Sequence, residues 1–519
     1  MSKATKSPGK QSRHLKRIEK SMEQAESYDE WKALALEHDL LSGAQEWKEA
    51  DPTGLYDYNN IRTRLEKLQS LKAAKNDRGL LFALNEGIHG NMGGMGKPVL
   101  HSRSKIGTKE LINQYVQEIS DALKYFSPRR FKGVPYRERH DFFVRASHCY
   151  GRSALMLSGG GALGHFHLGV IKVLLEQELL PTVISGSSAG AFVAAMVGTH
   201  TREEMQAMFE DGSLQKKISA GAGKFKLHLT RGELEGLDEV EKGVARVIPN
   251  MTFQEAFEKT GLAINISISG AEPQQTSRLL NAITSPNVLI RSAVMASCAI
   301  PGVFPPVVLK AKNDAGRTQA YLPSRKWVDG SFSQDLPAKR LTRLYGVNHF
   351  IVSQVNPAVL PIVSDPKLES GIAGAAVQAG MAMSKFWVRG TLNFIQRHIP
   401  VTPKVGMTLS TVHALIDQEY TGDINIFPNF RYFNPKKLIS AISEEEIQQF
   451  IADGERATWP KVESIRINTM IGRTLDTILA KLDNNNTKAG NKAKKPGAKF
   501  DIPGVPDISP DGRPAKNAA

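Results

Sequence analysis

The chain has 519 residues and a mass of 56.9 kDa, which is enough for two or three domains of ordinary size. With 41% hydrophobic and 23% charged residues, its composition excludes a fibrous or wholly disordered protein. The two cysteines, Cys149 and Cys298, are too few for a disulfide framework or for a zinc site built by cysteines alone, and they fit a reducing compartment.

The net charge of +15 raises the question of a nucleic-acid or anionic-membrane partner. Most of the excess lies at the two ends. Residues 1–20 carry seven basic side chains against one acidic, and residues 483–519 carry seven against four. The chain between them is only mildly basic and has no nucleic-acid-binding motif, so we expect no nucleic-acid partner.

The chain shows no signal for export or for a membrane span. The basic N-terminus is not followed by the apolar run of a secretory signal. The uncharged run from Leu179 to Thr201 is long enough to cross a bilayer, but Pro181 and the small residues around Gly186 favour a buried strand followed by a buried helix. We expect a cytoplasmic protein, peripheral to a membrane or lipid body.

In chain order, helical spacing of apolar residues predicts a helical N-terminal region, which includes a helix from about Thr108 to Phe126. From Ser153 onward, short apolar runs alternate with glycine clusters and amphipathic segments, the pattern of βαβ units in a parallel sheet. The predicted division is a disordered tail over 1–20, a helical domain over 21–150, an α/β domain over 151–345, a mostly helical extension over 346–482 and a disordered tail over 483–519.

A glycine-rich loop follows the first predicted strand of the α/β region. Gly159, Gly160, Gly161 and Gly164 fit G-x-G-x-x-G between a strand and a helix, which is the context of a dinucleotide site. Such a site also needs an acid at the end of the next strand, and Ser187 stands there instead. The alternative use of the loop is an oxyanion site, in which backbone N–H groups stabilise the negative oxygen of an acyl-transfer intermediate.

A nucleophile motif occupies the next strand-to-helix turn. Gly186, Ser188 and Gly190 fit G-x-S-x-G, which places a serine on a sharp turn with its hydroxyl exposed at the top of the sheet. A serine needs a base to take its proton. The sequence offers two kinds: the downstream histidines, which no local pattern marks out, and Asp329, which ends a short apolar segment and precedes Gly330. The histidines in question are His349, His398 and His413.

Together, GGGALG, GSSAG and WVDGS resemble, in this order, the motifs of the patatin-like phospholipase family over about residues 153–345. The resemblance implies a three-layer α/β/α core with a mostly parallel sheet, flanked by helical regions. It also implies that Ser188 is the nucleophile, that Asp329 is its base, and that the amides of Gly159, Gly160 and Gly161 form the oxyanion hole. Ser331 departs from the family, which usually has Ala or Gly after Asp-Gly.

The region before the core adds to this resemblance. Residues 28–126 look like the uncharacterised domain that precedes the patatin core in triacylglycerol lipases of yeast lipid droplets and plant oil bodies, and the segment GERATWP at 454–460 resembles the same subgroup. The implied function is a serine acyl hydrolase acting on long-chain acyl lipids, triacylglycerol or phospholipid, without cofactor or metal. The alternatives are a non-catalytic lipid-binding scaffold and a dinucleotide-binding oxidoreductase.

A lipid substrate at a membrane or lipid-droplet surface requires contact with that surface. Residues 371–399 combine an uncharged start with aromatic and basic residues such as Trp387 and Arg389, which suits an interfacial helix. A packed core helix with a polar edge explains the same pattern, so the sequence leaves both interpretations open.

Overall fold

The structure is a computed structural model. It describes residues 8–490 except 129, 223–236, 273–274, 302, 332–334, 358, 361–420 and 430–441. The predicted interfacial segment 371–399, and with it His398 and His413, lies outside the described residues.

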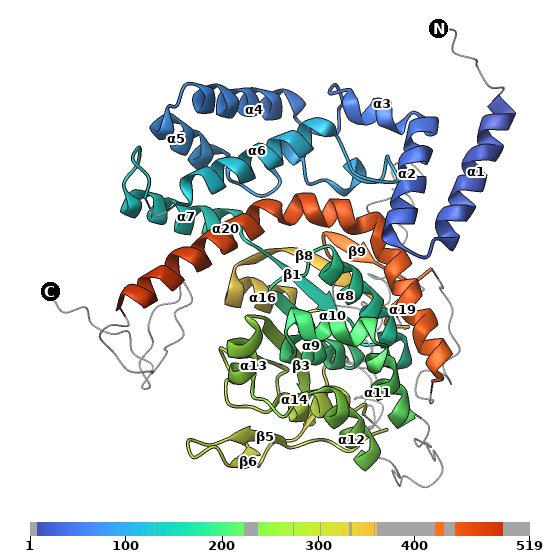
Figure 1. Ribbon diagram of the computed structural model, residues 1–519. Coiled ribbons are helices and arrows are strands. Elements are labelled where there is room, and N and C mark those ends of the chain that lie inside the picture. The colour runs from blue at the N-terminus through green and yellow to red at the C-terminus, as the bar shows by residue number, and fades with distance from the viewer. Residues whose placement is uncertain are drawn as a thin grey trace, which may run out of the picture. The chain divides into compact units, whose positions relative to one another are not determined.

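The elements follow one another in the order shown in Figure 1. The strands are β1 (Arg152–Leu157), β2 (Val183–Gly186), β3 (Ala263–Gly270), β4 (Arg278–Leu280), β5 (Leu309–Lys312), β6 (Thr318–Tyr321), β7 (Trp327–Asp329), β8 (Val347–Ser353) and β9 (Ile424–Ile426). The helices before β2 are α1 (Pro8–Gln24), α2 (Tyr28–Ser42), α3 (Ala44–Glu49), α4 (Tyr58–Ala73), α5 (Asp77–Gly87), α6 (Glu110–Phe126), α7 (Tyr136–Tyr150) and α8 (Phe166–Glu176). The later helices are α9 (Ala189–Thr199), α10 (Arg202–Glu210), α11 (Ser213–Ala222), α12 (Leu237–Val247), α13 (Phe253–Thr260), α14 (Ile290–Ser297), α16 (Ala338–Tyr345), α19 (Glu444–Thr458) and α20 (Val462–Gly490). Short 3₁₀ turns are η1 (Met92–Gly94), η2 (Pro98–Leu100), η3 (Gly161–His165) and η5 (Trp459–Lys461).

The central sheet is mostly parallel, as predicted. Its strands run in the order β4-β3-β2-β1-β8-β9, and β7 pairs with β3 as well. The pairs β3–β2, β2–β1, β1–β8 and β8–β9 are parallel, whereas β4 and β7 are antiparallel to β3. The uncharged run proposed above as a strand and a helix forms β2 and α9.

Helices cover both faces of this sheet. Since alternate residues of each strand point to opposite faces, each strand contributes side chains to two cores. In β1, Leu155 and Leu157 belong to the core that α8, α9, α14 and α19 cover. Ala154 and Met156 belong to a second core on the other face, closed by α16 through Leu341. This arrangement confirms the predicted three-layer α/β/α fold.

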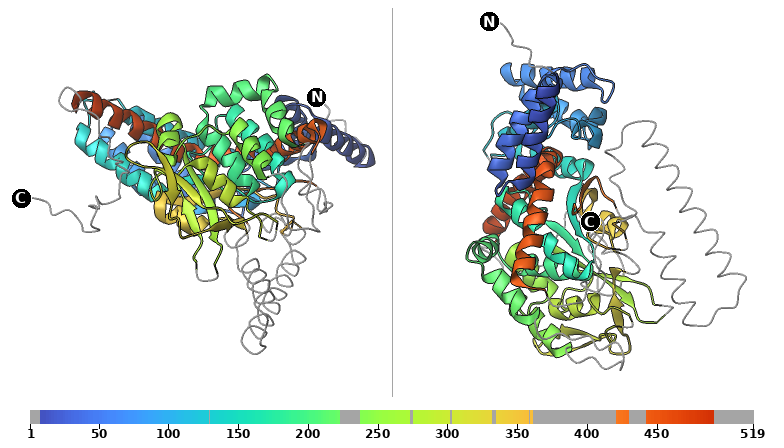
Figure 2. Two further views of the ribbon diagram at one scale, coloured as in Figure 1. Left: turned by 90° about the horizontal axis from the view of Figure 1, so that it is seen from below. Right: turned by 90° about the vertical axis from the view of Figure 1, so that its right-hand side faces the viewer.

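The helix α19 comes from far along the chain and lies along α8 (Figures 1 and 2). The two backbones meet at glycines: a Cβ on Gly169 would collide with the carbonyl of Ile451, and a Cβ on Gly454 would collide with the carbonyl of Phe166. Ser443 begins α19 with a capping box, in which its hydroxyl accepts from the backbone N–H of Glu446 at 3.2 Å. The α/β fold therefore uses a helix that lies about a hundred residues beyond the predicted end of the α/β domain at 345.

The sheet itself also extends past that end. The strand β8 begins at Val347 and lies between β1 and β9, so the predicted range 151–345 does not contain the whole sheet. The compact units differ from the predicted linear domains in the same way. One unit holds the chain up to Tyr58, Gly93–Asn113 and Gly151–Thr469, and the other holds Asn59–Met92, Gln114–Tyr150 and the chain from Met470.

The second unit is helical and contains its own buried polar anchor. Arg139 of α7 is 1% exposed, and its guanidinium donates to the carbonyls of Phe126, Pro128 and Val134. These hydrogen bonds satisfy a charge that would otherwise be costly to bury.

Both predicted tails are wrong in part. Residues 8–20 belong to the helix α1, because Ile18 and Met22 form an apolar stripe that is buried in the main core and outweighs the basic composition. At the other end, α20 runs to Gly490 instead of ending at residue 482. Once the helix is formed and packed through Leu482, each added residue gains a backbone hydrogen bond without a new nucleation step. The helix therefore extends at little cost in free energy.

In the described ranges, none of the long helices is apolar enough to cross a membrane.

Candidate active site

Ser188 occupies a strained turn between β2 and α9. Its φ of 51° and ψ of −121° are unfavourable for a residue with a side chain, as expected at a nucleophile elbow. The turn is tight enough to need glycine on both sides: a Cβ on Gly186 would collide with the carbonyl of Gly190, and a Cβ on Gly190 with that of Leu157. The strand, turn and helix predicted around the serine are all present.

Asp329 ends β7, where it lies opposite Ile268 of β3. Its side chain is 1% exposed, lies near the Ser188 side chain and accepts a hydrogen bond from the Ser331 backbone N–H at 2.8 Å. The following Gly330 lies against the carbonyl of Ser267, where a Cβ would collide. The structure thus brings together the serine and the aspartate that the motifs single out, although 141 positions of the sequence separate Ser188 from Asp329.

Burial changes the acidity of this aspartate. Loss of hydration raises the pKa of Asp329 from 3.8 to about 6, and the polar contacts of the carboxyl with Ser331 and Ser188 oppose this increase. The negative charge of Asp335 contributes a further, smaller increase. A carboxylate with this pKa is a stronger base than an exposed aspartate and is still largely ionised near neutral pH.

The end of α14 contacts both residues of the pair. The Ser297 hydroxyl accepts from the Ser188 backbone N–H at 2.9 Å, and the Cys298 thiol donates to the Ser188 carbonyl at 3.4 Å. The carbonyl of Ala299 accepts from the Asp329 backbone N–H at 3.0 Å. Three consecutive residues therefore anchor the backbone of both Ser188 and Asp329.

The glycine loop follows β1 and differs from the prediction in one respect. The Gly159 N–H donates to the Asp335 carboxylate at 2.8 Å, so this amide is already used and does not serve as an oxyanion donor in this geometry. For the amides of Gly160 and Gly161, the described residues provide no hydrogen-bond acceptor. Gly164 lets the loop approach α9, because a Cβ there would collide with the side chain of Ala189.

Asp335 is a buried site residue that the motifs do not reveal. It is fully buried, and its carboxylate accepts from the Ser187 hydroxyl, the Gly159 N–H and, at 3.1 Å, the Asn356 side-chain amide. Burial raises the pKa of this carboxyl. The only signal in the sequence is that Asp335 is a second acid in the otherwise uncharged stretch 327–337.

The described histidines lie away from Ser188 and Asp329. His349 contacts Ser153 at 3.0 Å, near the start of β1. His167 is fully buried, where its ring nitrogens contact the Ser353 hydroxyl at 2.7 Å and the Ser158 carbonyl at 3.0 Å. Burial lowers the pKa of His167 to about 4, so the ring is neutral. Within the described ranges, no histidine hydrogen-bonds to the candidate nucleophile or to its aspartate.

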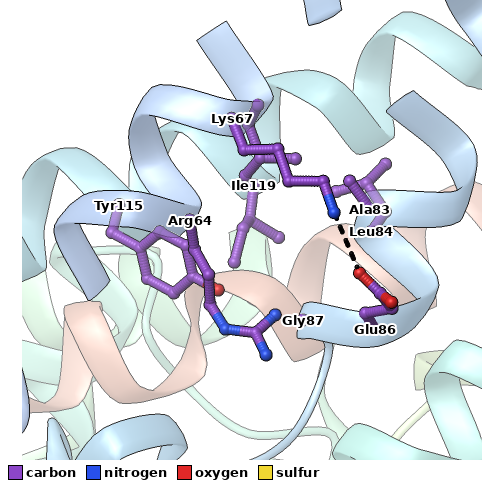
Figure 3. Close-up of a pocket in the computed structure, with 9 residues that line it drawn as sticks. Arg64, Lys67, Ala83, Leu84, Glu86, Gly87, Tyr115 and Ile119 are labelled. Carbon is purple, nitrogen blue, oxygen red and sulfur yellow. Dashed lines mark hydrogen bonds and ion pairs between the residues drawn. The ribbon is translucent and has the colours of Figure 1, made fainter. Parts of the chain in front are cut away.

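Several cavities lie among the described residues, and none of them is lined by Ser188 or Asp329. One of about 830 Å³ is lined by residues that include His101, Asp423 and Ser464. The pocket in Figure 3 lies between α4, α5 and α6, with Arg64, Tyr115 and the ion pair of Lys67 with Glu86 at 3.2 Å around it. The space inside it is about 10 Å³, which is room for about one water molecule and too small for a substrate. A search of the described ranges finds no cluster of three or more His, Cys, Asp or Glu side chains placed to hold a metal ion.

Comparison with known proteins identifies two family regions. Residues 155–342 match the patatin-like phospholipase family, and residues 9–148 match a domain of unknown function, DUF3336. A triacylglycerol lipase of Schizosaccharomyces pombe is 31% identical over 86% of this chain and 94% of its own length. A triacylglycerol lipase of Arabidopsis thaliana is 33% identical over 89% of this chain, and one of Saccharomyces cerevisiae is 33% identical over 85%.

The chain spans 58% of the length of the Arabidopsis relative and 50% of that of the Saccharomyces relative. The match to the Schizosaccharomyces lipase nevertheless covers nearly the whole of that protein, and the fold and the motif order agree with the matched family region. The chain therefore belongs to the patatin-like phospholipase family, in the group that carries the DUF3336 domain before the patatin domain.

Proposed function

We propose that this protein is a lipid acyl hydrolase that cleaves the carboxylic esters of long-chain acyl lipids with a Ser188–Asp329 dyad. The observation that carries the proposal is that residues 297–299 anchor the backbones of both Ser188 and the buried Asp329, which brings the serine and the carboxylate into one site. The strained elbow that presents Ser188 supports it, because such strain is maintained where a nucleophile must be exposed to its substrate.

In the proposed reaction, Asp329 takes the proton of the Ser188 hydroxyl while the oxygen attacks the ester carbonyl carbon. The tetrahedral intermediate collapses, the ester C–O bond breaks, and Asp329 returns the proton to the leaving alcohol. A water molecule then attacks the acyl-enzyme, and Asp329 takes one proton of this water. The Ser188 oxygen leaves with that proton, and a fatty acid is released.

The amides of Gly160 and Gly161 are the proposed donors to the oxyanion. Both lie in the loop that opens η3, next to the serine elbow. Fixed backbone donors stabilise the charge that develops on the carbonyl oxygen, and one such donor is typically worth about 10²–10³ in rate. Gly159 is left out of this assignment because its N–H donates to Asp335.

The proposed substrate is a long-chain acyl lipid at a membrane or lipid-droplet surface, to which the protein binds peripherally. The named relatives are triacylglycerol lipases, which favours triacylglycerol over phospholipid. A panel of triolein, phosphatidylcholine and lysophosphatidylcholine emulsions, with released fatty acid as the readout, separates these substrates.

Ser188→Ala and Asp329→Asn test the dyad. We expect each variant to lose fatty-acid release by about 10³-fold or more, because the two residues act as one unit. Ser213→Ala, at the start of α11, is the matched serine control and keeps the activity of the unmodified protein. Wild-type activity in the folded Ser188→Ala variant would refute the dyad.

A non-catalytic lipid-binding scaffold is the second candidate. It predicts that the unmodified protein binds lipid emulsions but releases no fatty acid and does not react with a fluorophosphonate probe. Labelling of the unmodified protein together with absent labelling of Ser188→Ala would exclude the scaffold.

A further inference from the structure

Asp335 joins three loops at the carboxyl ends of neighbouring parallel strands. One of its oxygens, Oδ1, accepts from both the Gly159 N–H after β1 and the Ser187 hydroxyl after β2. The other oxygen, Oδ2, accepts from the Asn356 side-chain amide after β8. A single fully buried carboxylate thus holds the loops around the proposed active site.

The two contacts of Oδ1 lie beside the reacting groups. Ser187 directly precedes the proposed nucleophile, and Gly159 directly precedes the proposed oxyanion donors. A shared acceptor fixes the distance between the serine elbow and the glycine loop. It also removes the Gly159 N–H from the group of amides that could face the substrate.

We propose that Asp335 is a positioning residue that clamps the glycine loop to the serine elbow and so aims the amides of Gly160 and Gly161 at the acyl oxygen. This inference rests on the function proposed above. Catalysis needs such donors within a few tenths of an ångström of their place, because a misplacement of about 1 Å can cost about 10²-fold in rate.

The charge of Asp335 has a second effect, on the base. The Asp335 carboxylate is the charged group that acts on Asp329 from a neighbouring segment, and the Cys298 thiol after α14 is a titratable group close enough for Asp329 to raise its pKa. A negative charge on Asp335 opposes ionisation of Asp329, which raises the pKa of that aspartate. Position and charge can therefore be tested separately.

Asp335→Ala removes both the clamp and the charge. We expect kcat for fatty-acid release to fall by about 10²–10³-fold with KM changed by less than threefold, since the lost interaction acts on the transition state. Asp335→Asn keeps an oxygen for Gly159 and Ser187 but loses the charge. We expect it to keep kcat within about tenfold, and the acid limb of its kcat/KM profile to move to lower pH.

Asp39→Ala is the matched control. Asp39 is also 1% exposed and accepts two backbone N–H groups, from Lys105 at 2.7 Å and from Ile106 at 3.2 Å, but it has no contact with the proposed site. We expect its melting temperature to fall, as for Asp335→Ala, while kcat per folded molecule stays unchanged. A general loss of stability would change kcat per folded molecule alike in both variants. Loss of the clamp lowers it only in Asp335→Ala.

The clamp is overturned if folded Asp335→Ala keeps kcat within threefold of the unmodified protein. An unmoved acid limb in Asp335→Asn rejects only the effect of the Asp335 charge on Asp329. Should Asp335→Ala fail to fold, Ser187→Ala decides, because it removes one of the two contacts of Oδ1. A tenfold loss of kcat supports the clamp and an unchanged kcat rejects it.

Ser188→Ala is assayed in parallel. Full activity in that variant rejects the proposed function itself, whereas an inactive Ser188→Ala beside a fully active Asp335→Ala rejects only the clamp.

Discussion

Asp329 owes its basicity to the environment that the fold builds around it. It lies at the end of β7 with 1% of its surface exposed, and burial raises its pKa to about 6. The same burial opposes folding wherever the carboxyl is ionised, because the unfolded chain offers it full hydration. Ionisation of Asp329 therefore favours the proposed reaction but lowers the free energy of unfolding.

The pH dependence of activity reports this pKa. The proposed mechanism needs Asp329 deprotonated, so log kcat/KM is expected to rise with unit slope below about pH 6 and to level off above it. The measurement is kcat/KM for a soluble short-chain ester from pH 4.5 to 8, with stability monitored at each pH. An acid limb near pH 4 would mean that Asp329 is not the base.

Folding stability also depends on the ionisation of Asp329, but in the opposite direction to activity. Because the pKa is 3.8 unfolded and about 6 folded, the carboxyl weakens folding progressively from about pH 4 to pH 6, and the full cost remains above that. Asp329→Asn removes the ionisation. We expect the melting temperature of this variant, relative to the unmodified protein, to be higher at pH 8 than at pH 5. An equal difference at both pH values would contradict the buried ionisation.

Residues next to one another in sequence could be predicted, whereas residues that meet only in the fold could not. Ser188 and Asp329 each lie in a short motif of consecutive residues, so the sequence identifies both. Asp335 contacts Gly159 and Ser187 across 176 and 148 positions. No local sequence pattern indicates contacts between residues so far apart. An acidic residue near a motif aspartate can also have many other roles.

The elements show how backbone contact between helices depends on single glycines. The α8 and α19 backbones approach each other at Gly169 and Gly454, where any side chain would meet a carbonyl group. Both glycines lie in amphipathic helical segments, so the helices could be predicted from periodicity. Their pairing could not, because neither glycine reveals which distant helix it faces.

Gly169→Ala tests this contact. The added methyl group would collide with the Ile451 carbonyl, and we expect the free energy of unfolding to fall by about 1–3 kcal/mol. The matched control is Gly243→Ala in α12, where a Cβ meets nothing within 4 Å. There, alanine is expected to stabilise by about 0.4–1 kcal/mol, since it favours the helix and restricts the unfolded chain. Urea unfolding measures both, and equal effects of the two substitutions would contradict the close approach.

The whole molecule depends on segments that lie far apart in the sequence. One buried core includes Ile18 of α1, Leu157 of β1, Ile351 of β8 and Ile451 of α19. Composition and motifs predict the α/β region and its parallel sheet. They do not predict which flanking segments complete it, because apolar residues in a helix indicate burial without indicating a partner.

A fragment limited to residues 151–345 is therefore expected not to fold. It lacks β8, so β1 would lose a parallel neighbour and become an exposed edge, and it lacks α19, so the face of α8 would be uncovered. Size-exclusion chromatography and near-ultraviolet circular dichroism of this fragment, beside the full chain, make the test. A monomeric fragment with a cooperative melting transition would show that the core is complete without the later elements.

The contacts of residues 297–299 with both Ser188 and Asp329 have a mechanical consequence. Since one short segment holds the backbone of nucleophile and base, a shift of α14 carries the two together and leaves their separation unchanged. The glycine loop has no such link to α14 and is held by Asp335 instead. Because Asp335 also accepts from the Ser187 hydroxyl beside Ser188, it couples the loop to the same elbow, so a shift of α14 would carry the proposed nucleophile, its base and the oxyanion donors together.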